Sequence, residues 1–274
     1  MYDFEDLYRD IEYAKRQGMH VEKIGKSYLG REIFAIHQGD MQGRQIFVQG
    51  AIHAREWITA KLLVTMMREY DGEVGVWCVP MSNPDGCMLT AYGIDSVNDH
   101  HIREFLTRLN PTDDYRYWKA NCRGVDLNVN FNADWGKGRR NVTYPCSANY
   151  IGMFPESEVE TKALVGFTKR IMPYATLSYH AKGRVIYQGY KEIIPYEDVS
   201  KEIADSTGYS LEESMGSAGG YKDWYVATTR RLGLTIEVGD DDCDITQLER
   251  DFDNMVAQNQ YVLDILAKAK DVIL

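Results

Sequence analysis

The sequence predicts a single α/β domain built on a mixed, mostly parallel sheet that is flanked by helices. Two apolar runs, 44–50 and 74–80, have the composition of buried strands, and residues 57–70 between them have helical spacing. A strand, a helix and a second strand in succession typically form a parallel pair with a crossover helix. The chain has 274 residues and no linker rich in proline, glycine or serine. That length is ordinary for one domain, so we expect one domain over residues 1–274.

The other regular elements follow from hydrophobic periodicity and from helix-end signals. Residues 3–16 have apolar side chains on one helical face, and Gly208 marks the end of a later helix. The same criteria predict strands at 20–25, 31–39, 174–180 and 232–239, and helices at 155–171, 195–208 and 245–269.

Two segments are expected to be irregular. The tetrapeptide Asn-Pro-Asp-Gly at 83–86 is a strong turn signal. Residues 110–155 are rich in asparagine, glycine, arginine and tyrosine and have weak periodicity. We expect long loops there, and loops on a rigid scaffold are the usual place for functional residues.

Composition excludes several function classes. Apolar residues make up 44% and charged residues 26% of the chain, which is typical of a globular protein. The formal net charge of −10 argues against nucleic acid and anionic membranes as general partners, although it allows a locally basic pocket. The sequence does not determine the oligomeric state.

The cysteines and the N-terminal residues bear on the compartment. Five cysteines without close pairs are not typical of a disulfide framework or a zinc knuckle. The first residues contain acids where a signal peptide has a basic segment and a long apolar one. We therefore expect a cytoplasmic protein.

Polar residues with metal-binding or acid–base chemistry lie at or just past the ends of three predicted strands. His53 and Glu56 follow the strand at 44–50, His180 ends the strand at 174–180, and Glu237 lies near the end of the strand at 232–239. In open α/β sheets, ligands bind in the crevice beyond the carboxyl ends of the strands. These four residues are therefore expected to converge.

Two imidazoles and one carboxylate suit one Zn²⁺ ion with an open fourth position. Such a site polarises a carbonyl group and lowers the pKa of water to about 7. Glu237 is then the candidate general base, which takes a proton from water and returns it to the leaving amine. The alternative is that His-x-x-Glu occurs by chance and that these residues have structural roles.

Seven segments of the chain resemble, in order, the zinc metallocarboxypeptidases of the carboxypeptidase A type. They are HAREW, NPDG, WKANCRGVDLNVNF, YIGMFPESEVETKAL, SYHAKG, GSAGGYKDW and LTIEVG. Several resemble most the bacterial branch that cleaves γ-D-glutamyl-meso-diaminopimelate bonds in peptidoglycan peptides. The resemblance implies an eight-stranded mixed sheet flanked by helices. It also implies that His53, Glu56 and His180 bind zinc and that Glu237 is the base.

Further roles are implied by the same resemblance. Arg55 faces the substrate carbonyl, and Asp126 orients a ligand imidazole, with a turn aspartate as the alternative reading. Asn128 matches an asparagine that helps to hold the substrate carboxylate. Lys119 lies where relatives have an arginine that stabilises the oxyanion, so the charge is kept but the bidentate fork is lost.

The sequence departs from the family pattern at two positions. Val129 stands where the pattern has an arginine that clamps the terminal carboxylate, which puts ordinary carboxypeptidase action in doubt. The family pattern also has a tyrosine that covers the bound C-terminal residue. Its place in this chain is near Met215, and no tyrosine stands there.

Cations near the expected site point to an acidic substrate. Lys222 falls at the base of the family's side-chain pocket, where a cation favours an anionic side chain such as that of diaminopimelate. The other candidate substrate-binding cations are Arg116, Arg139, Arg140 and Lys182. The alternative is that most of these cations are solvated surface residues.

Three functions are compatible with these residues. The first is a zinc peptidase acting on small acidic peptides derived from peptidoglycan. The second is a carboxypeptidase or amidase for another acidic substrate. Val129 argues against the simple carboxypeptidase form of this function. The third is a non-catalytic binding module, although such modules commonly lose part of a site that is complete here.

Overall fold

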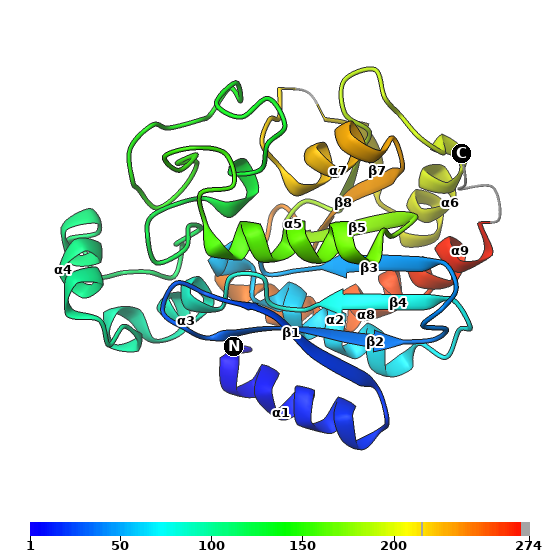
Figure 1. Ribbon diagram of the computed structural model, residues 1–274, viewed down its shortest axis with the longest axis horizontal. Helices are drawn as coiled ribbons and strands as arrows, with labels where there is room; N and C mark the ends of the chain where they lie inside the picture. The colour runs from blue at the N-terminus through cyan, green and yellow to red at the C-terminus, as the bar shows by residue number, and fades with distance from the viewer. Residues whose placement is uncertain (215, 270–274) are drawn as a thin grey trace.

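A computed structural model describes residues 1–214 and 216–269 of the protein. Its centre is an eight-stranded mixed sheet in the order β1-β2-β4-β3-β5-β8-β6-β7 (Figure 1). Four of the seven strand pairs are parallel, and the fold class predicted from the sequence is confirmed. The strands are β1 (His20–Lys26), β2 (Glu32–Gln38), β3 (Gln45–Gln49), β4 (Gly75–Val79), β5 (Ala175–Ala181), β6 (Val185–Gln188), β7 (Ser210–Glu213) and β8 (Leu232–Val238).

Helices cover both faces of the sheet, as Figure 1 shows for α5 on the near face and α2 and α8 on the far face. No helix in the described residues is long and apolar enough to span a bilayer. The α-helices are α1 (Phe4–Arg16), α2 (Ile58–Glu69), α3 (Pro84–Tyr92), α4 (His100–Leu109), α5 (Val159–Ile171), α6 (Glu197–Thr207), α7 (Tyr221–Thr229), α8 (Phe252–Asn259) and α9 (Val262–Lys268). Short 3₁₀ helices are η1 (Ala54–Glu56), η2 (Gly93–Ser96), η3 (Leu127–Val129) and η4 (Ile245–Asp251).

Alternation along the central strands divides the core into two layers. In β3, Ile46 and Val48 belong to the core cluster that contains residues of α1, α2, α6, α8 and α9, whereas Phe47 points to the opposite face and packs against Phe167 of α5 and Tyr221 of α7. Successive side chains of a strand point to opposite faces, so a strand buried on both faces is apolar throughout. All five residues of β3 are buried, which makes this strand a rigid support for the loop that follows it.

The prediction of one long helix at 245–269 is wrong. Asp244 accepts a hydrogen bond from the backbone N–H of Thr246 and begins η4, and residues 260–261 separate α8 from α9. Helix α8 packs on α2 and also contacts α6, whereas α9 packs on α6. The region predicted as one helix is therefore divided into η4, α8 and α9.

Five elements were missed by the sequence patterns. The strands β6 and β7 have four residues each, and β7 is an edge strand with mostly exposed side chains. The helices α3 and α7 have buried residues around most of their circumference, so they lack an amphipathic period. Helix α4 is amphipathic, but it lies on the border of the segment that we expected to form loops.

The predicted turn at 83–86 is the start of α3. Asn83 caps this helix by accepting from the N–H of Gly86 at 3.1 Å, and Pro84 occupies the first turn. The Asn83 amide also donates to the carbonyls of Ile52 and Ala120, both at 3.2 Å. Asn83 therefore fixes the backbone immediately before His53.

Asp85, in the first turn of α3, holds the loop between β1 and β2. Its buried carboxylate accepts from the Ser27 hydroxyl at 2.8 Å, the Leu29 N–H at 2.7 Å and the Arg31 guanidinium at 2.7 Å. A buried carboxylate requires such partners because burial removes its hydration. Through Asn83 and Asp85, α3 therefore connects the backbone before His53 to the loop between β1 and β2.

Replacing Asp85 with alanine should lower the free energy of unfolding by about 3 kcal/mol, because Arg31 and two further donors lose their buried acceptor. Urea denaturation measures this change. The control is Glu104→Ala, which removes an exposed i,i+4 pair with Arg108 and should cost no more than about 0.5 kcal/mol. Equal effects of the two substitutions would contradict this role of Asp85.

Candidate metal centre and catalytic cleft

Three neighbouring parallel strands bring the predicted site residues together. The strand β5 lies between β3 and β8 and runs parallel to both, so their carboxyl ends meet at one edge of the sheet. His180 is the penultimate residue of β5, and Glu237 of β8 is its direct partner in the register. His53 and Glu56 follow β3 in the turn that leads to α2.

The turn after β3 is held by buried hydrogen bonds. The N–H of Ala51 donates to the Thr59 hydroxyl at 2.7 Å, and this hydroxyl donates to the carbonyl of Glu56 at 2.8 Å. The N–H of Ala54 donates to the carbonyl of Lys119 at 3.1 Å. These bonds fix the backbone of η1, so that His53 before it and Glu56 at its end present their side chains to the same point.

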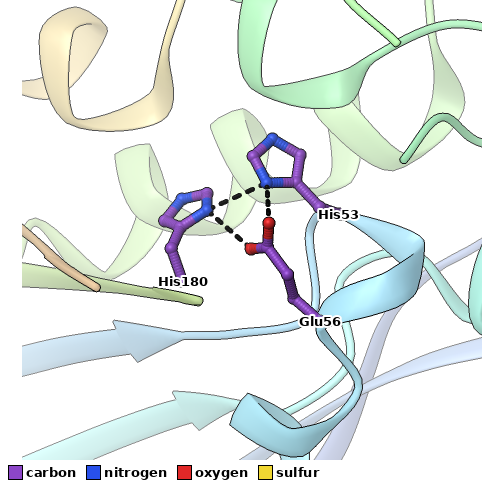
Figure 2. Close-up of side chains that lie close together, drawn as sticks. All are labelled: His53, Glu56 and His180. Carbon is purple, nitrogen blue, oxygen red and sulfur yellow. Dashed lines mark hydrogen bonds and ion pairs between the residues drawn. The ribbon is translucent and has the colours of Figure 1, made fainter. Parts of the chain in front are cut away.

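His53, Glu56 and His180 form a compact cluster of electron-rich atoms (Figure 2). Nδ1 of His53 lies 2.9 Å from one oxygen of Glu56, and Nδ1 of His180 lies 3.0 Å from the other. The two Nδ1 atoms are 3.0 Å apart. Two nitrogens and two carboxylate oxygens therefore face a common centre, and one shared cation would satisfy them all.

The donor set and its burial fit zinc. The three residues are 4%, 2% and 1% exposed, so the carboxylate has little water to stabilise its charge. Two imidazole nitrogens and one carboxylate are a common protein ligand set for Zn²⁺ in catalytic sites. Burial tends to raise the pKa of Glu56, but His53 and His180 outweigh it and hold this pKa well below the usual value. The carboxylate is therefore available as a ligand at neutral pH.

Asp126 contacts the ring nitrogen of His53 that does not face the cluster. Its Oδ1 lies 3.3 Å from Nε2 of His53, and its Oδ2 lies 3.1 Å from Nζ of Lys119. Burial tends to raise the pKa of Asp126, but Lys119 and His53 outweigh it and hold this pKa far below the usual value. A carboxylate at Nε2 favours the tautomer that keeps a proton there and leaves Nδ1 free to bind a metal. This geometry agrees with the role that was expected for Asp126.

Glu237 has the environment of a general base. Part of its side chain faces the cleft, but the surrounding protein desolvates its carboxyl group and raises its pKa to about 7. His180 lowers this pKa, and the charge of Glu56 raises it. A bound dication would act in the same direction as His180. A carboxylate with a pKa near neutrality can accept and return a proton during turnover.

Two cavities meet at Glu237. We call them the Lys222 cavity, of about 430 Å³, and the His53 cavity, of about 690 Å³. Both volumes are within the usual range for ligand sites. The Lys222 cavity is lined by residues that include Asn128, Val129, Arg139, Arg140, Lys222 and Glu237. The His53 cavity is lined by residues that include His53, Arg55, Lys119, Arg140, Lys182 and Glu237.

The predicted cations differ in how they face these cavities. Arg139 and Arg140 line the Lys222 cavity with exposed side chains, and Arg140 also lines the His53 cavity. Lys222 lines its cavity, but its ammonium group forms a buried ion pair with Asp223 at 2.7 Å. Arg116 lines neither cavity and pairs with Asp114 at 2.7 Å, so the structure does not bring it into the site.

The remaining predicted residues lie around the cluster. Arg55 lines the His53 cavity and approaches the carbonyl of Tyr117 at 3.5 Å. Lys182 lines the same cavity and pairs with Asp241 at 3.3 Å. The Asn128 amide nitrogen lies 3.4 Å from Nε2 of His180. Met215, near which the sequence lacks the covering tyrosine of the family pattern, lies outside the described residues.

Sequence reasoning missed two features of the cleft. Asp223 neutralises Lys222, and the only sequence signal is that the two residues are adjacent. Asp241, Asp242 and Asp244, which belong to the acidic run GDDDCD at 239–244, line the His53 cavity. The available signal was that this run begins two residues after Glu237.

A parallel sheet that delivers a His-Glu-His cluster and a neighbouring acid to one edge defines a class of mononuclear metallohydrolases. The sequence model of the zinc carboxypeptidase family matches residues 4–260, and the chain therefore belongs to this family. Zinc is the cofactor of the family, in agreement with the ligand set.

Similar proteins include several from bacteria. The chain is 30% identical over 264 residues to γ-D-glutamyl-L-diamino acid endopeptidase 1 of Lysinibacillus sphaericus, covering 87% of this chain and 65% of that protein. It is also 30% identical over 242 residues to an uncharacterised protein, YqgT, of Bacillus subtilis, covering 79% of this chain and 64% of that protein. The chain thus spans slightly less than two thirds of the length of these relatives.

Solved structures share the fold. Bovine thrombin-activatable fibrinolysis inhibitor, in complex with a tick carboxypeptidase inhibitor, superposes with a TM-score of 0.81 at 21% identity, covering 97% of this chain and 96% of that one. The murein-tripeptide amidase MpaA of Escherichia coli O157 superposes with a TM-score of 0.60 at 20% identity, covering 92% and 93%. At these identities the comparisons support the fold alone.

Replacing His180 with alanine should abolish tight zinc binding, because two donors remain where three are needed. Metal analysis of the purified variant, together with circular dichroism to show that it is folded, tests this. His101→Ala, at an exposed position of α4, is the control and should keep one zinc. One tightly bound equivalent in the His180 variant would overturn the ligand assignment.

Replacing Asp126 with asparagine should weaken zinc binding about 10- to 100-fold, the usual effect of losing the carboxylate behind a ligand imidazole. Competition with a chelating dye measures the affinity. Asp113→Asn, on an exposed loop, should leave it unchanged. An unaltered affinity in the Asp126 variant would mean that this residue only supports the turn.

Proposed function

We propose that the protein is a zinc-dependent peptidase that hydrolyses the γ-D-glutamyl-meso-diaminopimelate bond of peptidoglycan-derived peptides. The observation that carries the catalytic part is that Glu237 is the direct sheet neighbour of His180, in a chain that belongs to the zinc carboxypeptidase family. The substrate is supported by the relative from Lysinibacillus sphaericus, whose name gives a bond between γ-D-glutamate and a diamino acid.

The proposed chemistry divides between the metal and the side chains. When bound, zinc supplies a Lewis acid that polarises the substrate carbonyl and makes water more acidic. Glu237 accepts the proton of the attacking water and delivers it to the leaving amine. Arg55 and Lys119 line the His53 cavity together with Glu237. They supply positive charge for the substrate oxygen that becomes negative in the transition state.

Val129 replaces the arginine with which the family pattern holds a terminal carboxylate, so other residues must hold the carboxylates of the leaving residue. It lines the Lys222 cavity with an apolar side chain that cannot pair with a carboxylate. A carboxypeptidase for another acidic substrate is the second candidate, favoured by the basic residues of the same cavity. The two candidates differ in whether the amide that is cleaved is γ-linked.

The function is tested with L-Ala-γ-D-Glu-meso-diaminopimelate and the matched peptide that has an α-linked L-glutamate. Release of diaminopimelate is measured by mass spectrometry on zinc-loaded enzyme. We expect the γ-linked peptide to be cleaved with the higher kcat/KM. Faster cleavage of the α-linked peptide would support the second candidate, and cleavage of neither would contradict both.

Replacing Glu237 with glutamine should lower kcat about 10²- to 10⁴-fold while zinc stays bound, because the amide cannot accept a proton. Steady-state kinetics and metal analysis on the same sample measure both quantities. Glu213→Gln, on the exposed edge strand β7, is the control and should be fully active. Near-normal turnover of the Glu237 variant would rule out its role as the base.

A further inference from the structure

The charge of Lys222 is already compensated inside the protein. Its Nζ lies 2.7 Å from Oδ1 of Asp223 and also donates to the carbonyl of Gly189. The side chains of Lys222 and Asp223 are 5% and 1% exposed, so solvent does not weaken the pair. Oδ2 of Asp223 accepts from the Ser217 hydroxyl at 2.6 Å. A substrate carboxylate would have to displace a buried ion pair to reach this ammonium group, which is energetically unfavourable.

Arg139 and Arg140 offer the cavity uncompensated positive charge. Within residues 1–214 and 216–269 neither guanidinium forms an ion pair, whereas Lys137 of the same loop pairs with Asp134 at 3.0 Å. The guanidinium group presents a planar fork of donors that matches a carboxylate.

Arg139 is held by the backbone at Gly216, which also lines the cavity. The N–H of Arg139 donates to the carbonyl of Gly216 at 3.3 Å. A Cβ atom on Gly216 would lie only 2.7 Å from Nε of Arg139, so the absence of a side chain there lets the arginine lie across the backbone. The Arg139 side chain is therefore positioned by a contact that its own loop does not provide.

The two cavities differ in charge, which gives a carboxylate a preferred side. The His53 cavity contains Asp241, Asp242 and Asp244 in addition to the site carboxylates. In the Lys222 cavity the only carboxylates among the lining residues are Asp223, which is paired, and Glu237. The His53 cavity also contains the cations Arg55, Lys119, Arg140 and Lys182, so its charges are mixed. In the Lys222 cavity, apart from Glu237, the charges without an ion-pair partner among the described residues are those of Arg139 and Arg140, and they attract a carboxylate.

We propose that Arg139 and Arg140 form the carboxylate clamp of the Lys222 cavity and select a leaving residue that carries a free carboxylate. This proposal rests on the proposed function and deepens it. In this arrangement the loop 137–141 supplies the clamp. Val129 contributes an apolar lining residue, and Lys222 has a structural role through its ion pair with Asp223. Arg140 and Glu237 each line both cavities.

The experiment compares two substrates on five forms of the zinc-loaded enzyme. The substrates are L-Ala-γ-D-Glu-meso-diaminopimelate and the same peptide with both diaminopimelate carboxylates converted to amides. The enzyme forms are wild type, Arg139→Gln/Arg140→Gln, Arg139→Lys/Arg140→Lys, Lys222→Met/Asp223→Leu, which removes both partners of the buried pair, and Lys137→Gln. The measured quantity is the ratio of kcat/KM for the acid to kcat/KM for the amide.

The glutamine pair should lower this ratio about 10- to 100-fold, mainly through the KM of the acid, as expected for the loss of charge-assisted hydrogen bonds. The lysine pair should fall between it and wild type, because charge remains but the fork is lost. Lys137→Gln removes one charge from the same loop outside the cavity and should keep the wild-type ratio. An unchanged ratio in the glutamine pair, or a fall of the same size when the Lys222–Asp223 pair is replaced as a whole, would overturn the proposal.

Calorimetry distinguishes this proposal from the proposed function, because it needs no turnover. Free meso-diaminopimelate and its diamide are titrated into wild type and into the glutamine pair. If wild type binds the acid more tightly than the diamide and the glutamine pair does not, the clamp is supported even where the peptide is not cleaved. If the peptide is cleaved but the arginines affect neither binding nor the ratio, the function stands and the clamp is refuted. If wild type neither binds diaminopimelate nor cleaves the peptide, both proposals fail.

Discussion

The site depends on one constraint, the parallel order of three adjacent strands at the centre of the sheet. Because β3, β5 and β8 run in the same direction, the residues at their carboxyl ends are brought to one edge, whatever their separation in sequence. An antiparallel strand at any of these positions would carry its polar residue to the opposite edge. The direct pairing of His180 with Glu237 in the register fixes the distance between a ligand and the candidate base without help from any loop.

Burial at this edge requires that each charge has a partner, and the partners rigidify the site. Glu56 lies against two imidazoles, and Asp126 lies between His53 and Lys119. Buried charges are tolerated only when they are paired or bind a metal, so each group restricts the conformation of the next. The same rule explains Asp85, whose three donors attach the loop before β2 to helix α3.

An acidic protein of net charge −10 can still hold an anionic substrate, because charge is distributed unevenly around the cleft. Aspartates of the acidic run at 239–244 line the His53 cavity, Arg139 lines the Lys222 cavity, and Arg140 lines both. In the proposed function, this uneven distribution would place the two exposed arginines at the leaving residue. Local charge around a desolvated cleft, rather than the sum over the chain, governs such recognition.

The sequence by itself determined the fold class and the convergence of His53, Glu56, His180 and Glu237, because apolar strand patterns followed by polar residues are local signals. The resemblance of its short segments indicated the family. The sequence did not determine β6, β7 or the break between α8 and α9, since these depend on edges and packing partners that are distant in the chain. Tertiary structure also decided which cations face the cleft. Lys222 and Arg139 are both cations in the sequence, but only the fold shows that Asp223 neutralises the first and that the second lies across Gly216. The charge that a side chain offers to a ligand depends on its partners in space, and residue identity and spacing do not specify those partners.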